Sequence, residues 1–434
     1  MKADRRWGRF LRPGCGVLCF AILLFSAPKP RYTGSVVESF DSLSTMDSTS
    51  SVDGWGSGSI RLRSAYGKLT AAAPALFPAW ADAATANDFD GDGWQDVIVS
   101  GSRYANVLAF AKNKGGGGQA RTFEIPANGW LGGCTGSGQN PLTGFGAAGI
   151  DASSFVALTS GDYDGDGDFD VFFMSFERSA PFQMERAYLF ENKGGLILTL
   201  HDVTAAMAGL AAPGGTSRCL VSVDFDDDGD VDVVYGDKDG NVHLLRNIYD
   251  AGWGAGMFSY EYGLLLSTGW TTTGIQALAV ADVDKNGHLD ILVGSRSSPE
   301  LRLYRNTGED AYDLAWIETL TGYGVDVILG ADFDNDGDAG FLVAATSPAG
   351  TGSPSARQIW YYLNDGGALA GKILFSGDVA GCGVGAGANF GAVIDLNRDA
   401  IPDAVLGGLN FTTGTAGRFL VENAALGLYN LSGV

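Results

Sequence analysis

A nine-residue loop with aspartate at alternate positions constrains this chain more than any other feature. It reads Asp-Tyr-Asp-Gly-Asp-Gly-Asp-Phe-Asp over residues 162–170, and the apolar residues 171–174 follow it directly. Carboxylates at positions 1, 3, 5 and 9 can converge on one hard cation, and the glycine at position 6 permits a sharp bend between them. Calcium takes six to eight oxygen ligands in a tolerant geometry, so the pattern favours calcium. We expect a metal loop that leads into a β-strand.

The pattern occurs six times, at a period of about sixty residues, which indicates repeated supersecondary units as in propellers and solenoids. The expected side-chain ligands are Asp88, Asp90, Asp92 and Asp96; Asp162, Asp164, Asp166 and Asp170; Asp224, Asp226, Asp228 and Asp232; Asp282, Asp284, Asn286 and Asp290; Asp332, Asp334 and Asp336; and Asp395, Asn397, Asp399 and Asp403. At the seventh position, where the main-chain carbonyl would bind, stand Trp94, Asp168, Asp230, His288 and Asp338. Four loops are complete. The fifth has Gly340 instead of its closing aspartate, and the sixth has Ala400 instead of glycine. We therefore expect four calcium sites, and at most six.

The EF-hand begins with the same D-x-D-x-D-G pattern and is the main alternative. Its loop needs a glutamate at position 12 and a helix on each side. The residues at position 12 here are Val99, Phe173, Tyr235, Val293, Val343 and Leu406. All six are apolar and stand in strand-like runs, which excludes an EF-hand.

Composition and charge agree with a strand-rich protein that binds metal. The chain has 434 residues, 65 of them glycine, and a formal net charge of −22. Bound calcium would neutralise much of the acidity that stands in the loops. The sequence has no basic stripe that would neutralise phosphates, which argues against a nucleic-acid partner.

The N-terminus has the pattern of a secretory signal. Residues 1–14 are basic and residues 16–27 are apolar, a run too short for a comfortable membrane span. We interpret residues 1–27 as a signal peptide or an uncleaved N-terminal anchor, the latter being the only expected link to a membrane. The protein would then be secreted, periplasmic or at the cell surface.

The strand pattern predicts an all-β propeller with four-stranded antiparallel blades. Each repeat has a small-residue strand, a metal loop, an apolar strand and a third strand that ends on asparagine, as in 107–113 and 301–306. Seven blades are favoured and six remain open, because residues 28–79 could form a leader with a metal-free first blade. The same segment could instead supply only outer strands that close the ring against the C-terminus. The repeats themselves occupy residues 80–434.

The unit formed by a small strand, Asp-x-Asp-x-Asp-Gly-x-x-Asp, an apolar strand and glycine resembles the FG-GAP/VCBS repeat of integrin α-subunit propellers and many secreted bacterial proteins. The resemblance covers about residues 80–434 and is most specific in the loops that begin at Asp88, Asp162, Asp224 and Asp282. It implies a calcium-stabilised propeller used outside cells for adhesion, with a glycan or protein as ligand. It also implies that each metal loop joins adjacent strands of a blade on one face.

The sequence gives little support for a catalytic function. His201, His243 and His288 are the histidines, and no G-x-S-x-G, H-E-x-x-H or P-loop pattern is present. We therefore lean against an enzyme, while a propeller-based hydrolase or lyase acting on polysaccharide or lipid remains an alternative, as does a structural subunit of an envelope complex. Trp130 and Trp253 stand in glycine-rich loops, where they would stack on sugar rings or else pack against blade edges. Cys219 is expected to be a buried apolar residue.

Overall fold

The computed structural model describes residues 58–63, 81–101, 107–114, 123–124, 130–132, 155–177, 184–195, 197–204, 219–248, 260–270, 274–308, 311–333, 337–347, 357–364, 366–375, 390–395, 398, 400, 402–409 and 416–425. In this part of the chain all regular elements are strands, and no helix is long and apolar enough to cross a membrane. The described strands all belong to the compact unit Gly34–Val434.

The strands form five four-stranded sheets and one five-stranded sheet, all with antiparallel neighbours. The five-stranded sheet contains β2 (Ala81–Asn87), β3 (Asp96–Gly101), β4 (Val107–Asn113), β5 (Phe123–Glu124) and β6 (Trp130–Gly132). The second contains β7 (Phe155–Gly161), β8 (Asp170–Glu177), β9 (Met184–Asn192) and β10 (Leu198–Asp202). The third contains β11 (Cys219–Val223), β12 (Asp232–Gly236), β13 (Asn241–Asn247) and β14 (Tyr260–Ser267). The fourth contains β15 (Ala277–Ala281), β16 (Asp290–Gly294), β17 (Glu300–Asn306) and β18 (Tyr312–Thr319). The fifth contains β19 (Gly324–Ala331), β20 (Gly340–Thr346), β21 (Arg357–Asn364) and β22 (Leu369–Phe375). The last contains β23 (Phe390–Ile394), β24 (Asp403–Leu409), β25 (Ala416–Ala425) and β1 (Gly58–Arg63).

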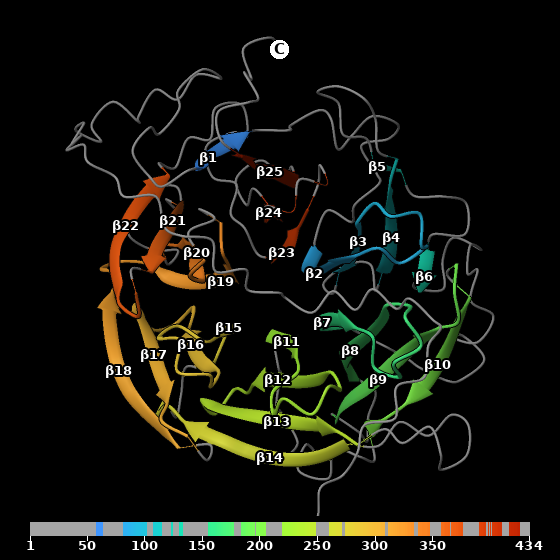
Figure 1. The fold of residues 1–434 in the computed structure, drawn as a ribbon, viewed down its shortest axis with the longest axis horizontal. Helices are drawn as coiled ribbons and strands as arrows, with labels where there is room; N and C mark the ends of the chain where they lie inside the picture. The colour runs from blue at the N-terminus through green and yellow to red at the C-terminus, as the bar shows by residue number, and fades with distance from the viewer. Residues whose placement is uncertain are drawn as a thin grey trace, which may run out of the picture. The chain divides into compact units, whose positions relative to one another are not determined.

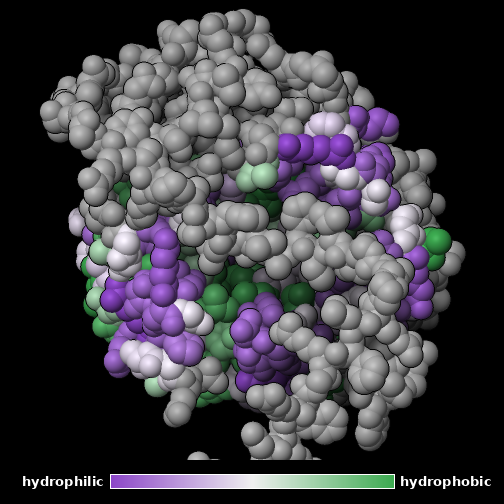
Figure 2. Space-filling model, in the orientation of Figure 1, coloured by the Kyte–Doolittle hydropathy of each residue, from purple (hydrophilic) through white to green (hydrophobic). Residues whose placement is uncertain are grey.

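The first strand of each repeat lies at the centre. β2, β7, β11, β15, β19 and β23 each contact the next strand in this series, and β23 contacts β2, so the inner strands close a ring (Figure 1). Their small residues suit this position because six strands must approach one another closely. The six inner strands line a central pocket of about 280 Å³. In the space-filling view, hydrophobic side chains gather at the centre and hydrophilic clusters surround them (Figure 2).

The ring is closed by the two ends of the described chain. β1 pairs with β25 in antiparallel register, from Gly58 opposite Ala425 to Arg63 opposite Leu420. Residues 58–63 are therefore the outermost strand of the last sheet and do not begin a separate blade. The favoured count of seven blades is wrong, because the N-terminal segment completes a sheet that the C-terminal strands leave one strand short.

The hydrophobic core consists of layers between neighbouring sheets. One cluster joins Phe173 and Phe190 of the second sheet to Phe89 and Ile98 of the first, and comparable clusters fill the four following interfaces. The second strands β12 and β16 are buried along their whole length. Gly294 ends β16 where a Cβ atom would lie 2.6 Å from the side chain of Val325 in the next sheet, so glycine is required there for close packing. The prediction of an all-β propeller with four-stranded antiparallel blades is confirmed at this level.

Candidate metal centres

Each acidic loop connects the innermost strand of a sheet to its second strand, as the resemblance implied. The six loops share one hydrogen bond, in which the backbone N–H of the sixth residue donates to Oδ2 of the first aspartate. The pairs are Gly93 to Asp88 (2.7 Å), Gly167 to Asp162 (3.0 Å), Gly229 to Asp224 (3.1 Å), Gly287 to Asp282 (2.9 Å), Gly337 to Asp332 (2.9 Å) and Ala400 to Asp395 (2.9 Å). All six residues have positive φ, which bends the chain back over the first carboxylate.

Three carboxylates converge in each of the four complete loops. They belong to positions 1, 3 and 9, and their oxygens lie within 4.8 Å of one another. The four groups are Asp88, Asp90 and Asp96; Asp162, Asp164 and Asp170; Asp224, Asp226 and Asp232; and Asp282, Asp284 and Asp290. Two oxygens bound to one calcium at about 2.4 Å each can be at most about 4.8 Å apart, so the spacing fits this ion.

Some oxygens of these carboxylates have no hydrogen-bond partner in the described structure. Oδ1 of Asp88, Oδ2 of Asp96 and Oδ1 of Asp284 are buried and have no hydrogen-bond partner. A buried carboxylate oxygen without a partner is costly, and a cation removes that cost. The donor chemistry and the burial of these groups therefore fit a calcium ion.

The ninth-position aspartate is buried and fixed by the backbone. Asp170 accepts hydrogen bonds from the N–H groups of Asn192 (2.8 Å) and Tyr163 (3.0 Å). Burial raises the pKa of Asp170 to about 8, and the charges of Asp164 and Asp162 act in the same direction, although the two hydrogen bonds oppose the shift. Burial likewise raises the pKa of Asp96 to about 8. Without a cation, these groups bind protons in the neutral pH range.

The fifth-position side chains, predicted as ligands, also make a turn hydrogen bond within their own loops. Oδ1 of Asp166 accepts the backbone N–H of Asp168 at 2.9 Å, and Asp92, Asp228 and Asn286 make the same turn bond. The groups of three converging acidic residues do not include Asp92, Asp166 or Asp228. Metal binding by the fifth position stays a prediction. The fifth-position side chains shape the turn that presents the seventh residue.

The fifth loop departs furthest from the pattern. A Cβ atom on Gly340 would lie 2.1 Å from the hydroxyl of Tyr361, so an aromatic side chain occupies the space of the closing carboxylate. Asp338 is buried and forms an ion pair with Lys285 of the preceding loop. Asp334 and Asp336 lie outside the described residues.

The sixth loop keeps its first and last acidic residues. Asp395 makes the shared hydrogen bond, and Asp403 is fully buried opposite Ile394. Asn397 and Asp399 lie outside the described residues.

A residue position that the sequence analysis did not single out lies beside the third-position carboxylate. It is the residue directly before the asparagine that ends the third strand. Lys112 bridges Asp90 and Asp92, Arg246 pairs with Asp226, and Arg305 pairs with Asp284. Glu191 stands at this position in the second sheet. Aligning the six repeats on their asparagines would have shown three basic residues in this place, together with the acids Glu191 and Glu422 and with Leu363.

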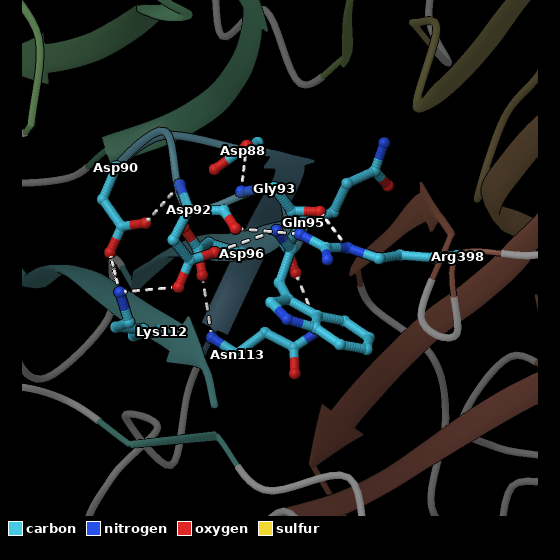
Figure 3. Close-up of polar contacts among 10 residues, drawn as sticks. Asp88, Asp90, Asp92, Gly93, Gln95, Asp96, Lys112, Asn113 and Arg398 are labelled. Atoms are coloured by element: carbon cyan, nitrogen blue, oxygen red, sulfur yellow. Dashed lines mark hydrogen bonds and ion pairs between the residues drawn. The ribbon is translucent and has the colours of Figure 1, made fainter. Parts of the chain in front are cut away.

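The first and last loops are joined directly. Arg398 of the sixth loop donates to the carbonyl of Gly93 and, at 2.9 Å, to that of Asp92 (Figure 3). Its guanidinium lies 4.2 Å from the ring centroid of Trp94, within range of a cation–π contact. Oε1 of Gln95 accepts the backbone N–H of Asp395 at 2.6 Å.

Three of the closing asparagines link neighbouring sheets. Nδ2 of Asn192 donates to the carbonyl of Phe89 in the preceding loop, at 2.8 Å. Asn247 and Asn364 make the same bond to Tyr163 and Val283, also at 2.8 Å. Since the acceptor is the second residue of a metal loop, each of these bonds holds one loop against the next sheet.

The other residues considered for chemistry have structural partners or lie outside the described part. His243 is a buried sheet residue, as expected, and is hydrogen-bonded to Asp237 (2.8 Å) and to Tyr262 (2.8 Å). Cys219 is half-buried with its sulfur near the carbonyl of Ile275. Residues 1–27, Trp253 and the side chain of Trp130 are not among the described parts.

The closed ring of antiparallel sheets with an acidic loop after each innermost strand defines a β-propeller with candidate metal loops. The family model of the FG-GAP-like repeat matches residues 224–293 and 282–343. The chain thus contains FG-GAP-like repeats, and the resemblance found in the sequence is confirmed.

Comparison with solved structures gives low overall similarity. An Agrocybe aegerita lectin, described as recognising non-reducing terminal N-acetylglucosamine, is 17% identical, with a TM-score of 0.43 over 80% of this chain and 81% of that one. Aleuria aurantia lectin, described as a six-bladed β-propeller that recognises fucose, is 9% identical, with a TM-score of 0.45 over 83% of this chain and 99% of that one. BBS1N in complex with ARL6DN is 14% identical, with a TM-score of 0.40 over 83% and 97%. Among curated proteins, none matches the chain.

Proposed function

We propose that the protein is a calcium-stabilised β-propeller that acts outside the cell as a binding module for a glycan or a protein. The observation that carries the calcium part is the convergence of three carboxylates in each of four equivalent loops. Asp88, Asp90 and Asp96 would hold the ion in the first loop, and the corresponding triads would do so in the others. The bound ion supplies positive charge that offsets the mutual repulsion of these carboxylates.

The protein's own residues prepare each loop. The sixth residue fixes one oxygen of the first aspartate through its N–H, and Oδ1 of Asp88 is buried without a hydrogen-bond partner. Backbone N–H groups orient the ninth-position carboxylate, as Asn192 and Tyr163 do for Asp170. Little reorganisation is then needed for ion binding, because the ligands are already in place.

The chemistry of these loops supports an extracellular location. Calcium modules that work outside cells have dissociation constants of about 10⁻⁴ to 10⁻³ M. A loop with three converging carboxylates and a competing basic residue suits such weak binding, and its ions would be bound where free calcium is millimolar. The basic and apolar pattern of residues 1–27 favours export as well.

The binding role rests on the architecture and on the FG-GAP-like repeats. Cross-sheet bonds from asparagines such as Asn192 hold neighbouring loops in fixed positions. A rigid scaffold that presents several loops on one face is suited to recognition, since binding residues are often found on loops positioned in this way.

The test uses the purified protein on a glycan array, in 2 mM calcium and in excess chelator, together with thermal unfolding in the same buffers. We expect the melting temperature to fall in chelator and glycan binding to be lost with it. An unchanged melting curve would contradict the calcium part. A protein that is stabilised by calcium but binds no glycan would be tested next against extracellular protein ligands.

A further inference from the structure

The residue before the closing asparagine differs in charge between sheets that are otherwise alike. Lys112, Arg246 and Arg305 precede Asn113, Asn247 and Asn306, while Glu191 precedes Asn192. All four asparagines donate their backbone N–H to Oδ1 of the ninth-position aspartate of their own sheet, at 2.6 to 2.8 Å. The preceding side chain is thereby placed over the same side of each loop.

In three loops this side chain is a lysine or arginine that forms an ion pair with a carboxylate proposed to bind calcium. Nζ of Lys112 contacts Oδ2 of Asp90 and lies 2.8 Å from Oδ2 of Asp92, between the two carboxylates (Figure 3). Nε of Arg246 lies 2.6 Å from Oδ2 of Asp226, and Nε of Arg305 lies 3.6 Å from Oδ2 of Asp284. These are partly buried pairs, so solvent screens them less than exposed ones.

In the second loop the same position adds negative charge. Glu191 is largely buried, accepts a hydrogen bond from His201 at 2.8 Å and pairs with Lys193 at 3.1 Å.

We propose that this one position sets the calcium affinity of each loop, with Lys112, Arg246 and Arg305 as tethered counter-ions and Glu191 marking the tightest site. The proposal rests on the calcium binding put forward above and assigns it unequally among the loops. A calcium ion that enters the first loop must displace an ammonium group from Asp90, whereas an ion in the second loop gains the attraction of a further carboxylate. Three loops then remain partly neutralised at low calcium, and the Asp162 loop responds first.

The experiment measures calcium affinity in the full chain and in charge-exchanged variants. Trp94 stands in the first loop, so terbium luminescence excited through tryptophan and competed by calcium reports that loop, and Trp94→Phe identifies its signal. Isothermal titration gives the tightest step. We expect Lys112→Gln to tighten calcium binding in the first loop at least tenfold, and Glu191→Lys to weaken the tightest step at least tenfold. Lys238→Gln removes the same charge from a surface turn, where Lys238 pairs with Asp239, and should leave both affinities within twofold.

Stability gives a second readout if Lys112→Gln folds poorly. In chelator this variant should melt at a lower temperature than the wild type, and millimolar calcium should restore it by a larger shift than it gives the wild type. Lys112→Arg retains the charge and should match the wild type in both buffers. The proposal is overturned if the wild type binds calcium and both charge variants keep its affinities. A wild type that binds no calcium in any loop would instead contradict the proposed function, and this assignment with it.

Discussion

The backbone N–H of Ala400 donates to the carboxylate of Asp395 at 2.9 Å, and Ala400 holds a φ of +64° to do so. Glycine fills this position in the other five loops, with φ between +83° and +98°. The sixth loop thus keeps the turn without the residue that favours it. For an L-residue this conformation costs about 1–2 kcal/mol.

Ala400→Gly should relieve that strain. We expect the free energy of unfolding to rise by about 0.5–1 kcal/mol, because part of the relief is offset by the greater entropy of glycine in the unfolded chain. Denaturant melts in calcium would measure it. Ala331→Gly, in strand β19, is the matched control and should lower stability by about 0.5–1 kcal/mol. If both substitutions destabilised the protein, the conclusion that the backbone at Ala400 is strained would be wrong.

Metal removal should make stability depend on pH in an unusual direction. The folded-state pKa values of Asp164 and Asp170 are raised to about 6 and about 8, whereas the unfolded value is near 4. The folded protein therefore binds more protons between these values, and this stabilisation, complete below about pH 4, is lost as the pH rises through 6 to 8. In chelator, the melting temperature should fall from about pH 5 to pH 8.

Calcium should abolish that decline, since the ion takes the place of the protons. Glu191 and Asp237 have lowered pKa values, so both are ionised above about pH 5 and their contribution to folding stability is complete there. They do not alter the change of melting temperature with pH above that value. Asp170→Asn removes the group with the highest pKa in the second loop and should flatten the decline between pH 6 and 8. A melting temperature that rises with pH in chelator would show that the carboxylates are ionised without metal.

The bonds between sheets predict unequal effects for two asparagines. Asn192→Ala removes a buried donor from the carbonyls of Phe89 (2.8 Å) and Phe169 (3.2 Å), so it should cost about 2–3 kcal/mol of unfolding free energy. The side chain of Asn306 bonds only within its own repeat: Nδ2 donates to the hydroxyl of Tyr312 at 3.3 Å, and Oδ1 accepts the N–H of Gly308 at 2.9 Å. Asn306→Ala should therefore cost about 1 kcal/mol. Equal losses in urea melts would refute the contribution of the link between sheets.

The fifth loop should resist repair by a single substitution. Gly340→Asp alone should destabilise by about 1–3 kcal/mol, because its Cβ atom meets the hydroxyl of Tyr361. Leu189, Leu244 and Leu303 stand where Tyr361 does in three sheets that keep the aspartate. In a Tyr361→Leu background Gly340→Asp should cost less, and a double-mutant cycle of melts measures the difference. An unchanged cost would mean that Tyr361 is not the obstacle.

Much of the fold could be predicted from the sequence because it depends on local patterns of residues. Alternating apolar residues, small inner strands such as Ala277–Ala281 and third strands that end on asparagine predict repeated antiparallel sheets. The loop at Asp162 predicts its own turn as well, since an aspartate and a glycine five residues apart suffice to form the bond between them. These features follow from interactions within a few residues, which a sequence displays directly.

Only the tertiary structure decided how the repeats combine. The pairing of Gly58–Arg63 with Ala416–Ala425 joins segments from opposite ends of the chain, and no local pattern specifies which edge an isolated strand completes. The contacts of Arg398 with Asp92 and of Asn192 with Phe89 also span long stretches of sequence. The ion pairs of Lys112 with Asp90 and of Arg246 with Asp226 join the third strand of a sheet to the loop that precedes its second strand. The sequence by itself determined the acidic loops and the strands around them, because both are local. The closure of the ring and the charge that faces each loop depend on packing between distant segments, so the three-dimensional structure was needed to find them.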